Sequence, residues 1–109
     1  MKQVNTNGCD HCGVSKTLKI IGSKWTMLLL HNLFEGKKRF GELERALVGI
    51  SPKTLSLRLQ ELETEGIINK KVFAEVPLHV EYTLTEKGLS LKSIFNAMTR
   101  WGDSKSEEI

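Results

Sequence analysis

Apolar residues recur at helical spacing along the first two thirds of the chain. Val14, Leu18 and Ile21 predict a short helix. Ser23 is a candidate N-cap, and the apolar residues after it predict a second, largely buried helix that ends at Gly36. The segment RFGELERAL predicts a third, short helix in the same register. The first half of the chain is therefore expected to be helical.

The strongest helix start signal lies in the segment GISPKTLSLRLQELETEG. Ser51 is placed to be the N-cap, and Pro52 occupies the first helical position, where its missing N–H is no loss. Leu55, Leu59 and Leu62 follow as an apolar stripe. We therefore predict a fourth helix with one buried and one polar side.

Beyond Gly66 the apolar period changes from that of a helix to that of a strand. The segments IINKKVFAE and HVEYTLT alternate apolar and polar residues and predict two strands, with Pro77 in the loop between them. Thr85 and Glu86 predict the start of a last helix, whose first turn Gly88 weakens by up to about 1 kcal/mol. This element order predicts an α+β fold, mostly α: a winged helix-turn-helix with a two-stranded wing.

Length and composition place the chain among soluble, single-domain proteins. It has 109 residues, of which 27% are charged and 39% hydrophobic, and its net charge is +3. We expect a folded domain over residues 12–102, with flexible ends at 1–11 and 103–109. No apolar run suits a membrane span or a secretory signal, which predicts a cytoplasmic protein. No nucleophile–base pair, phosphate loop or carboxylate pair stands out, so we expect neither enzymatic activity nor a cofactor.

The predicted helix that begins at Pro52 has the division expected of a DNA-recognition helix. The major groove accepts one α-helix, which buries one side and turns short polar and basic side chains outward. Arg58 is the candidate for reading guanine edges, and Lys53 for contacting phosphate. The candidate DNA contacts on this helix and in the flanking basic segments are Arg39, Ser51, Lys53, Thr54, Ser56, Arg58, Lys70 and Lys71.

Two interpretations of this helix stay open, because charge segregation also occurs on ordinary solvated helices. Basic residues gather at 37–39 and 70–71 and acidic ones at the helix end ELETE, which favours DNA binding. The alternative is a protein-interaction adaptor that keeps the winged-helix fold without binding DNA. Salt separates the two: a dimer that contacts phosphates loses affinity as salt rises, whereas an adaptor shows no duplex binding at low salt.

Three segments resemble the bacterial HxlR-type transcriptional regulators, relatives of the MarR group: KTLKIIGSKWTMLLL, KRFGELERALVGISPKTLSLRLQELETEGII and EVPLHVEYTLTEKG. The resemblance covers residues 12 to 102. Its specific motifs are Gly-x-Lys-Trp at 22–25, Arg-Phe-x-Glu-Leu at 39–43, Ile-Ser-x-Lys-x-Leu-Ser at 50–56 and Val-Glu-Tyr-x-Leu-Thr at 80–85. It implies a transcriptional regulator that binds double-stranded DNA as a homodimer on partial palindromes. The recognition role then falls on residues 51–58 and the wing role on 76–79.

The resemblance also implies that the N- and C-terminal helices form much of the dimer interface. The apolar stripe of the last helix supports this independently, because so small a domain has little need of all its members for its own core. The candidate interface residues are Leu91, Phe95, Met98 and Trp101. In the wing, His79 stands where the family has arginine. This departure weakens a permanent minor-groove charge and leaves open a pH-dependent contact or an ordinary exposed residue.

Cys9, His11 and Cys12 lie close together near the N-terminus. Structural zinc normally takes four ligands, so three predict no metal site, and no βαβ pattern supports a thioredoxin-type disulfide. The resemblance implies that Cys12 occupies the position of a sensor thiol for a small electrophile or oxidant. It assigns no role to Cys9, which is a candidate resolving partner because it lies three residues away. A helix N-terminus and Lys16 favour the Cys12 thiolate, whereas Asp10 opposes it. An unused thiol is the alternative.

Overall fold

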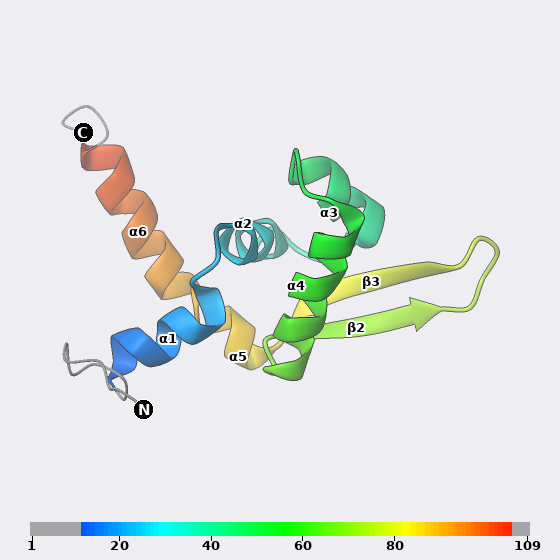
Figure 1. Ribbon diagram of the computed structural model, residues 1–109, viewed down its shortest axis with the longest axis horizontal. Coiled ribbons are helices and arrows are strands. Elements are labelled where there is room, and N and C mark those ends of the chain that lie inside the picture. Colours follow the sequence, from blue (N-terminus) through cyan, green and yellow to red (C-terminus); the bar gives the residue numbers. More distant parts are fainter. Residues whose placement is uncertain (1–11, 106–109) are drawn as a thin grey trace.

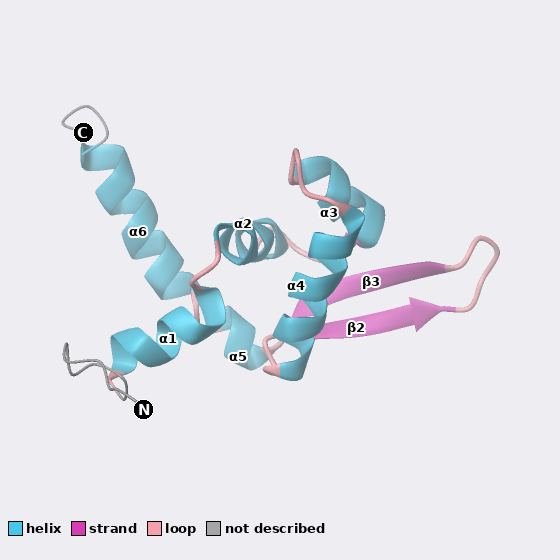
Figure 2. Cartoon of the chain, viewed as in Figure 1, coloured by secondary structure: helices cyan, strands magenta, loops and turns pink. Residues whose placement is uncertain are grey.

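The computed structural model describes residues 12–105. Its elements follow the predicted order (Figures 1 and 2): α1 (Gly13–Ile21), α2 (Lys24–Leu33), β1 (Lys38–Arg39), α3 (Phe40–Ala46), α4 (Pro52–Thr64), β2 (Ile68–Phe73), β3 (His79–Leu84), α5 (Glu86–Leu89) and α6 (Lys92–Lys105). The winged helix-turn-helix prediction is confirmed. None of the described helices is both long and apolar enough to cross a membrane.

The sheet has one strand more than the sequence predicts. Besides the predicted hairpin of β2 and β3, the described residues include β1, which pairs antiparallel with β3 and gives the strand order β1-β3-β2. Lys38 lies opposite Tyr82, and Arg39 lies opposite Glu81. A two-residue strand is too short for a periodic signal, so only its pairing partner reveals it.

Helix α4 begins and ends as its sequence predicts. The Ser51 hydroxyl accepts a hydrogen bond from the Thr54 N–H at 3.1 Å, as an N-cap does, and Pro52 opens the helix. At the other end, Gly66 adopts a φ of 76°, and the Lys87 Nζ donates to the Glu65 carbonyl at 2.9 Å. Contacts within the chain therefore fix both ends of α4.

The single last helix predicted from the sequence is two helices. Ser90 is the C-cap of α5, and the chain bends there before α6 begins. Gly88 is buried, and a Cβ at this position would collide with the carbonyl oxygen of Ile67. Its interpretation as a weak helical position was therefore incomplete, because the missing side chain lets α5 pack against the start of the hairpin. Helix α6 continues to Lys105, beyond the expected domain boundary at residue 102.

A single core joins the helices to the base of the hairpin. Its centre is formed by leucines of α2, α3 and α4, to which the hairpin and α6 add isoleucine and aromatic side chains. The buried apolar residues are Ile21, Leu29, Leu30, Leu33, Leu43, Leu47, Ile50, Leu55, Leu59, Leu62, Ile67, Ile68, Tyr82 and Phe95. From this core the hairpin projects on one side, while α1 and the free end of α6 lie on the other (Figure 1).

Candidate nucleic-acid interface

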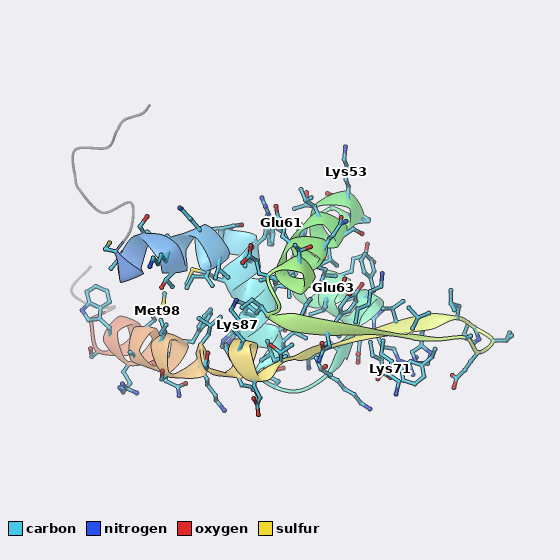
Figure 3. The ribbon with its side chains drawn as sticks, turned by 90° about the horizontal axis from the view of Figure 1, so that it is seen from below. Lys53, Glu61, Glu63, Lys71, Lys87 and Met98 are labelled. Atoms are coloured by element: carbon cyan, nitrogen blue, oxygen red, sulfur yellow. The ribbon has the colours of Figure 1, made fainter. Side chains whose placement is uncertain are left out.

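The side of α4 opposite its buried stripe is exposed and mixed in character. Lys53, Ser56, Leu57 and Gln60 are exposed, and Leu57 keeps 48% of its surface accessible. In Figure 3 Lys53 points away from the rest of the molecule. No described carboxylate lies within ion-pairing distance of Lys53, and no acidic residue occupies the first turn. This end of α4 is therefore suited to approach a polyanion.

Leu57 and Gln60 are exposed residues of α4 that are not among the predicted DNA contacts. Both lie on the helix face opposite Leu55 and Leu59, and their angular position along α4 could have identified them. An apolar side chain on such a face can contact a thymine methyl group, and a glutamine can bond an adenine edge. The outward surface of α4 is therefore less basic and more varied than expected.

Two of the predicted contacts also hold the helix N-terminus together. The Ser51 hydroxyl accepts from the Thr54 N–H and donates to the Thr54 Oγ1 at 3.0 Å. Thr54 is only half-exposed, whereas Ser51 is exposed. Their first role is to cap α4, and a phosphate contact would have to share these groups.

Arg58 lies on the flank of α4 and not on its outward face. Its Nη1 donates to Glu61 Oε1 at 2.9 Å, its side chain is 29% exposed, and its Nε is buried without a hydrogen-bond acceptor among the described residues. The guanidinium borders a cleft of about 360 Å³ between α4 and the α1–α2 junction, which includes Ser23 and Thr26. Reading a guanine edge would require Arg58 to leave Glu61, so that role stays a prediction.

The three basic residues before α3 differ in whether their side chains form ion pairs. Arg39 is exposed, and its backbone N–H donates to Glu42 Oε1 at 2.8 Å. Lys38 pairs with Glu35 at 3.1 Å, and Lys37 lies 3.7 Å from Glu81. Arg39 is thus the member of this segment whose side chain takes no part in these ion pairs.

The two predicted lysines of the hairpin lie on opposite faces of the sheet. Lys70 is in register with Tyr82, and Lys71 with Glu81, so neighbouring residues alternate between the faces. Lys71 Nζ lies 5.0 Å from the ring centre of Phe73 and points to the opposite side of the molecule from Lys53 (Figure 3). Lys71 therefore does not extend the basic surface at Lys53.

His79 is held within the hairpin. Its ring stacks on Phe73 with centroids 4.6 Å apart, its Nδ1 is 3.6 Å from Glu75, and its Nε2 is 3.4 Å from Glu81. Only 14% of its side chain is exposed. His79 is therefore not the ordinary exposed wing residue that one interpretation of the sequence allowed.

Tyr82, in the centre of the sheet, is the buried phenol of this region. Burial raises the pKa of Tyr82 above its usual value, and the negative charge of Glu63 raises it further. The phenol thus stays protonated at neutral pH, and it contributes no charge to the hairpin.

The four residues predicted for a dimer interface separate into two groups. Phe95 is 8% exposed and meets the ring of Phe34 edge-on at 5.1 Å, and Leu91 is half-buried against the same core. Met98 and Trp101 are 47% and 61% exposed, and Met98 points from α6 towards α1 (Figure 3). The first pair completes the core of the subunit, and only the second pair remains available to a partner.

Cys12 is the N-cap residue of α1, as predicted, with a φ of −83° and a ψ of 164°. The Lys16 N–H donates to its carbonyl oxygen at 3.0 Å. Cys12 is disulfide-bonded in this structure. Cys9, the other predicted member of the sensor site, lies outside the described residues. Across residues 12–105, no group of histidine, cysteine and carboxylate side chains is placed to hold a metal.

Comparison with known proteins agrees with this arrangement. The HxlR-like helix-turn-helix family matches residues 20–109. The HTH-type transcriptional regulator sll1512 of Synechocystis is 40% identical over 112 residues, covering 99% of this chain and 83% of its own.

Two solved structures are similar to most of this chain. One is the redox regulator HypR in its reduced form, with a TM-score of 0.81 and 43% identity over 85% of this chain and 92% of its own. The other is reduced YodB from Bacillus subtilis, with a TM-score of 0.76 and 38% identity over 90% of this chain and 97% of its own. HypR has also been solved oxidised, and YodB after diamide treatment. This chain belongs to the HxlR family of helix-turn-helix transcriptional regulators.

Proposed function

We propose that two copies of this chain bind a partially palindromic DNA operator, with one α4 helix in each of two major grooves. The observation that carries the proposal is the outward face of α4, where Lys53, Ser56, Leu57 and Gln60 are exposed. The opposite side of this helix is buried in the core, and hydrogen bonds within the chain fix both of its ends. A rigid helix can place such groups in a groove with little loss of conformational entropy.

The contacts divide into positioning and reading. Lys53, Arg39 and Lys70 supply positive charge for phosphates, which sets the register of the protein on the duplex. Ser56, Leu57 and Gln60 meet the base edges. Arg58 joins them only if DNA competes successfully for its bond to Glu61.

Dimerisation is supported by exposed apolar side chains on the two terminal helices. Val14 and Leu18 of α1 are 66% and 57% exposed, and Met98 and Trp101 of α6 add to the same end of the molecule. A symmetric partner would cover these residues. The two α4 helices would then lie one helical turn of DNA, or a multiple of one turn, apart.

We further propose that thiol chemistry at Cys12 switches this dimer. Cys12 begins α1, whose exposed face would contribute to the interface, and HypR and YodB are relatives with oxidised or diamide-treated forms. When diamide joins two thiols, they lose two electrons and two protons, and diamide becomes a hydrazine. The resulting change at the start of α1 would alter the spacing of the two α4 helices.

The test of DNA recognition is to sequence the duplexes that the purified full chain selects from a random library, and then to measure affinity against salt. A partial palindrome and a steep salt dependence are expected. Lys53→Ala should flatten the slope of log K against log salt by about 1.8, because the dimer loses two phosphate contacts. Lys92→Ala, an exposed lysine at the start of α6, is the control with an unchanged slope. Failure to bind duplexes at low salt would favour a protein-interaction adaptor.

The thiol switch is tested on the selected operator with protein kept reduced by dithiothreitol and with protein treated with diamide or a quinone. Wild type should change its affinity on treatment, and Cys12→Ser should not. Cys9→Ser should lose the diamide response if Cys9 is the resolving thiol, but should keep a response to the quinone. Equal responses of wild type and both variants would contradict the switch.

A further inference from the structure

The tip of the hairpin is apolar and projects beyond the helices (Figure 1). Val76 is fully exposed, at 101% of its reference surface, and Leu78 is 66% exposed. The loop from Ala74 to Leu78 contains no basic residue. Neither of the two apolar side chains belongs to the core, so the tip does not owe its composition to the folding of the subunit.

The ionisable groups next to the tip are turned towards each other. Glu75 lies 3.6 Å from His79 Nδ1, while Glu81 lies 3.4 Å from His79 Nε2 and 3.7 Å from Lys37. The stacking of His79 on Phe73 fixes this ring parallel to its neighbour. The hairpin therefore presents apolar side chains at its end and keeps its histidine behind them.

We propose that Val76 and Leu78 form an apolar wedge that contacts the DNA minor groove and that this contact, and not a positive charge, determines which flanking sequences the protein prefers. The inference rests on the proposed DNA binding of α4. Aliphatic side chains in a minor groove press against sugars and base steps and partly unstack them, which bends the duplex.

The positive charges near the hairpin are arranged around this wedge. Leu78 borders a cleft of about 400 Å³, whose α3 side carries Arg39 and Arg45. Lys70 is exposed on the hairpin edge nearer the core. These cations suit the phosphates on either side of a groove, while the apolar tip suits the groove itself. The partner that matches this combination of cations and apolar tip is the same DNA duplex that α4 binds.

A preference for particular base steps follows. A wedge enters most easily where stacking is weak, so pyrimidine–purine steps such as TpA should be favoured at the wing position. A charged wing would instead favour A-tracts, because their narrow minor groove concentrates negative potential. The wedge should also leave the salt dependence of binding unchanged when it is removed, because it releases no counterions.

The experiment uses the full chain and the duplex selected from the random library, with either a TpA step or an A-tract placed at the flank that the hairpin reaches. The double variant Val76→Ser with Leu78→Ser should bind the TpA duplex about tenfold more weakly than wild type, since two apolar contacts are lost. It should bend the duplex less in a fluorescence energy-transfer assay, and its salt slope should stay that of wild type. Val72→Ser, at a 53% exposed valine within β2, is the matched control and should leave all three measurements unchanged.

Val76→Arg sharpens the result by placing a charge in the same groove. It should steepen the salt slope by about 1.8, because the dimer gains two such charges, and shift the preference from TpA towards the A-tract. If the double variant binds both duplexes as wild type does, the wedge is wrong even though α4 binds DNA. If wild type selects no duplex at all, the proposed function fails first, and the two failures are thus distinct.

Discussion

At the hairpin end of the molecule, Leu55, Leu59 and Leu62 of α4 are buried against the same chain, and polar groups remain outside. At the opposite end, Leu18 of α1 and Trp101 of α6 are more than half exposed. Both regions are built from amphipathic helices, but the terminal helices bury only part of their apolar residues within one subunit. This difference supports the proposal that a second copy covers the exposed apolar residues of the terminal helices, whereas the buried stripe of α4 needs no partner subunit.

The largest effect expected from this comparison is within α4 itself. Leu59→Ala should lower the free energy of unfolding by about 3 kcal/mol, because it leaves a cavity in a side-chain position that is 2% exposed. Leu57→Ala, two residues away and 48% exposed, should change it by less than about 0.5 kcal/mol and should weaken operator binding instead. Urea unfolding of both variants measures the free energy of unfolding, and DNA titration measures their affinity for the operator. Equal losses of stability would mean that the two faces of α4 are not distinct.

The junction between the two regions should be the next most sensitive position. Gly88→Ala should destabilise the fold by about 2 kcal/mol, because its Cβ would press on the Ile67 carbonyl at the start of the hairpin. Gly102→Ala, in an open helical position of α6, should be neutral or stabilising by up to about 1 kcal/mol. Thermal unfolding of both variants measures the difference in stability. If Gly88→Ala were as stable as wild type, α5 would not be tightly packed on the hairpin.

At the terminal end, Trp101→Ala should weaken dimerisation about tenfold or more, because large aromatic side chains contribute much of the energy of an interface. The unfolding of the separated subunit should hardly change, since Trp101 is 61% exposed within it. Val48→Ala, at an 85% exposed valine between α3 and α4, is the control. Analytical ultracentrifugation over a range of concentrations gives the dissociation constants. A monomeric wild type at micromolar concentration would contradict the dimer.

The smallest expected effect is the pH dependence carried by Tyr82. Its pKa is raised in the folded state, so the folded protein holds the phenolic proton more tightly than the unfolded chain does. The stability linked to this group is fully present below the unfolded value of about 10 and is lost as pH rises through the folded value. Tyr82→Phe should remove that part of the alkaline loss. The urea unfolding midpoints of wild type and Tyr82→Phe are compared below and above pH 10. If the two midpoints change with pH in the same way, the effect is excluded.

The local signals of the sequence predicted α4 and its caps well. Ser51, Pro52 and Gly66 each act within one turn of the backbone, so their residue types are sufficient to mark the ends of the helix. The change to alternating residues likewise predicted the hairpin. These features depend on neighbours along the chain, and the sequence lists those neighbours completely.

Other features depended on residues far apart in the sequence. β1 exists because Lys38 and Arg39 pair with β3, and Gly88 is needed because Ile67 approaches it. Neither periodicity nor charge counts contain these contacts.

By itself, the sequence determined the order of the first four helices and the hairpin, the caps of α4, and the family. The tertiary structure decided which members of each apolar stripe were buried and which stayed available, separating Phe95 from Met98 and Trp101. It also decided that His79 lies between two carboxylates and that Val76 and Leu78 stay exposed at the end of the wing. The physical reason is that backbone propensity acts over a turn, whereas burial and charge pairing depend on how distant segments pack.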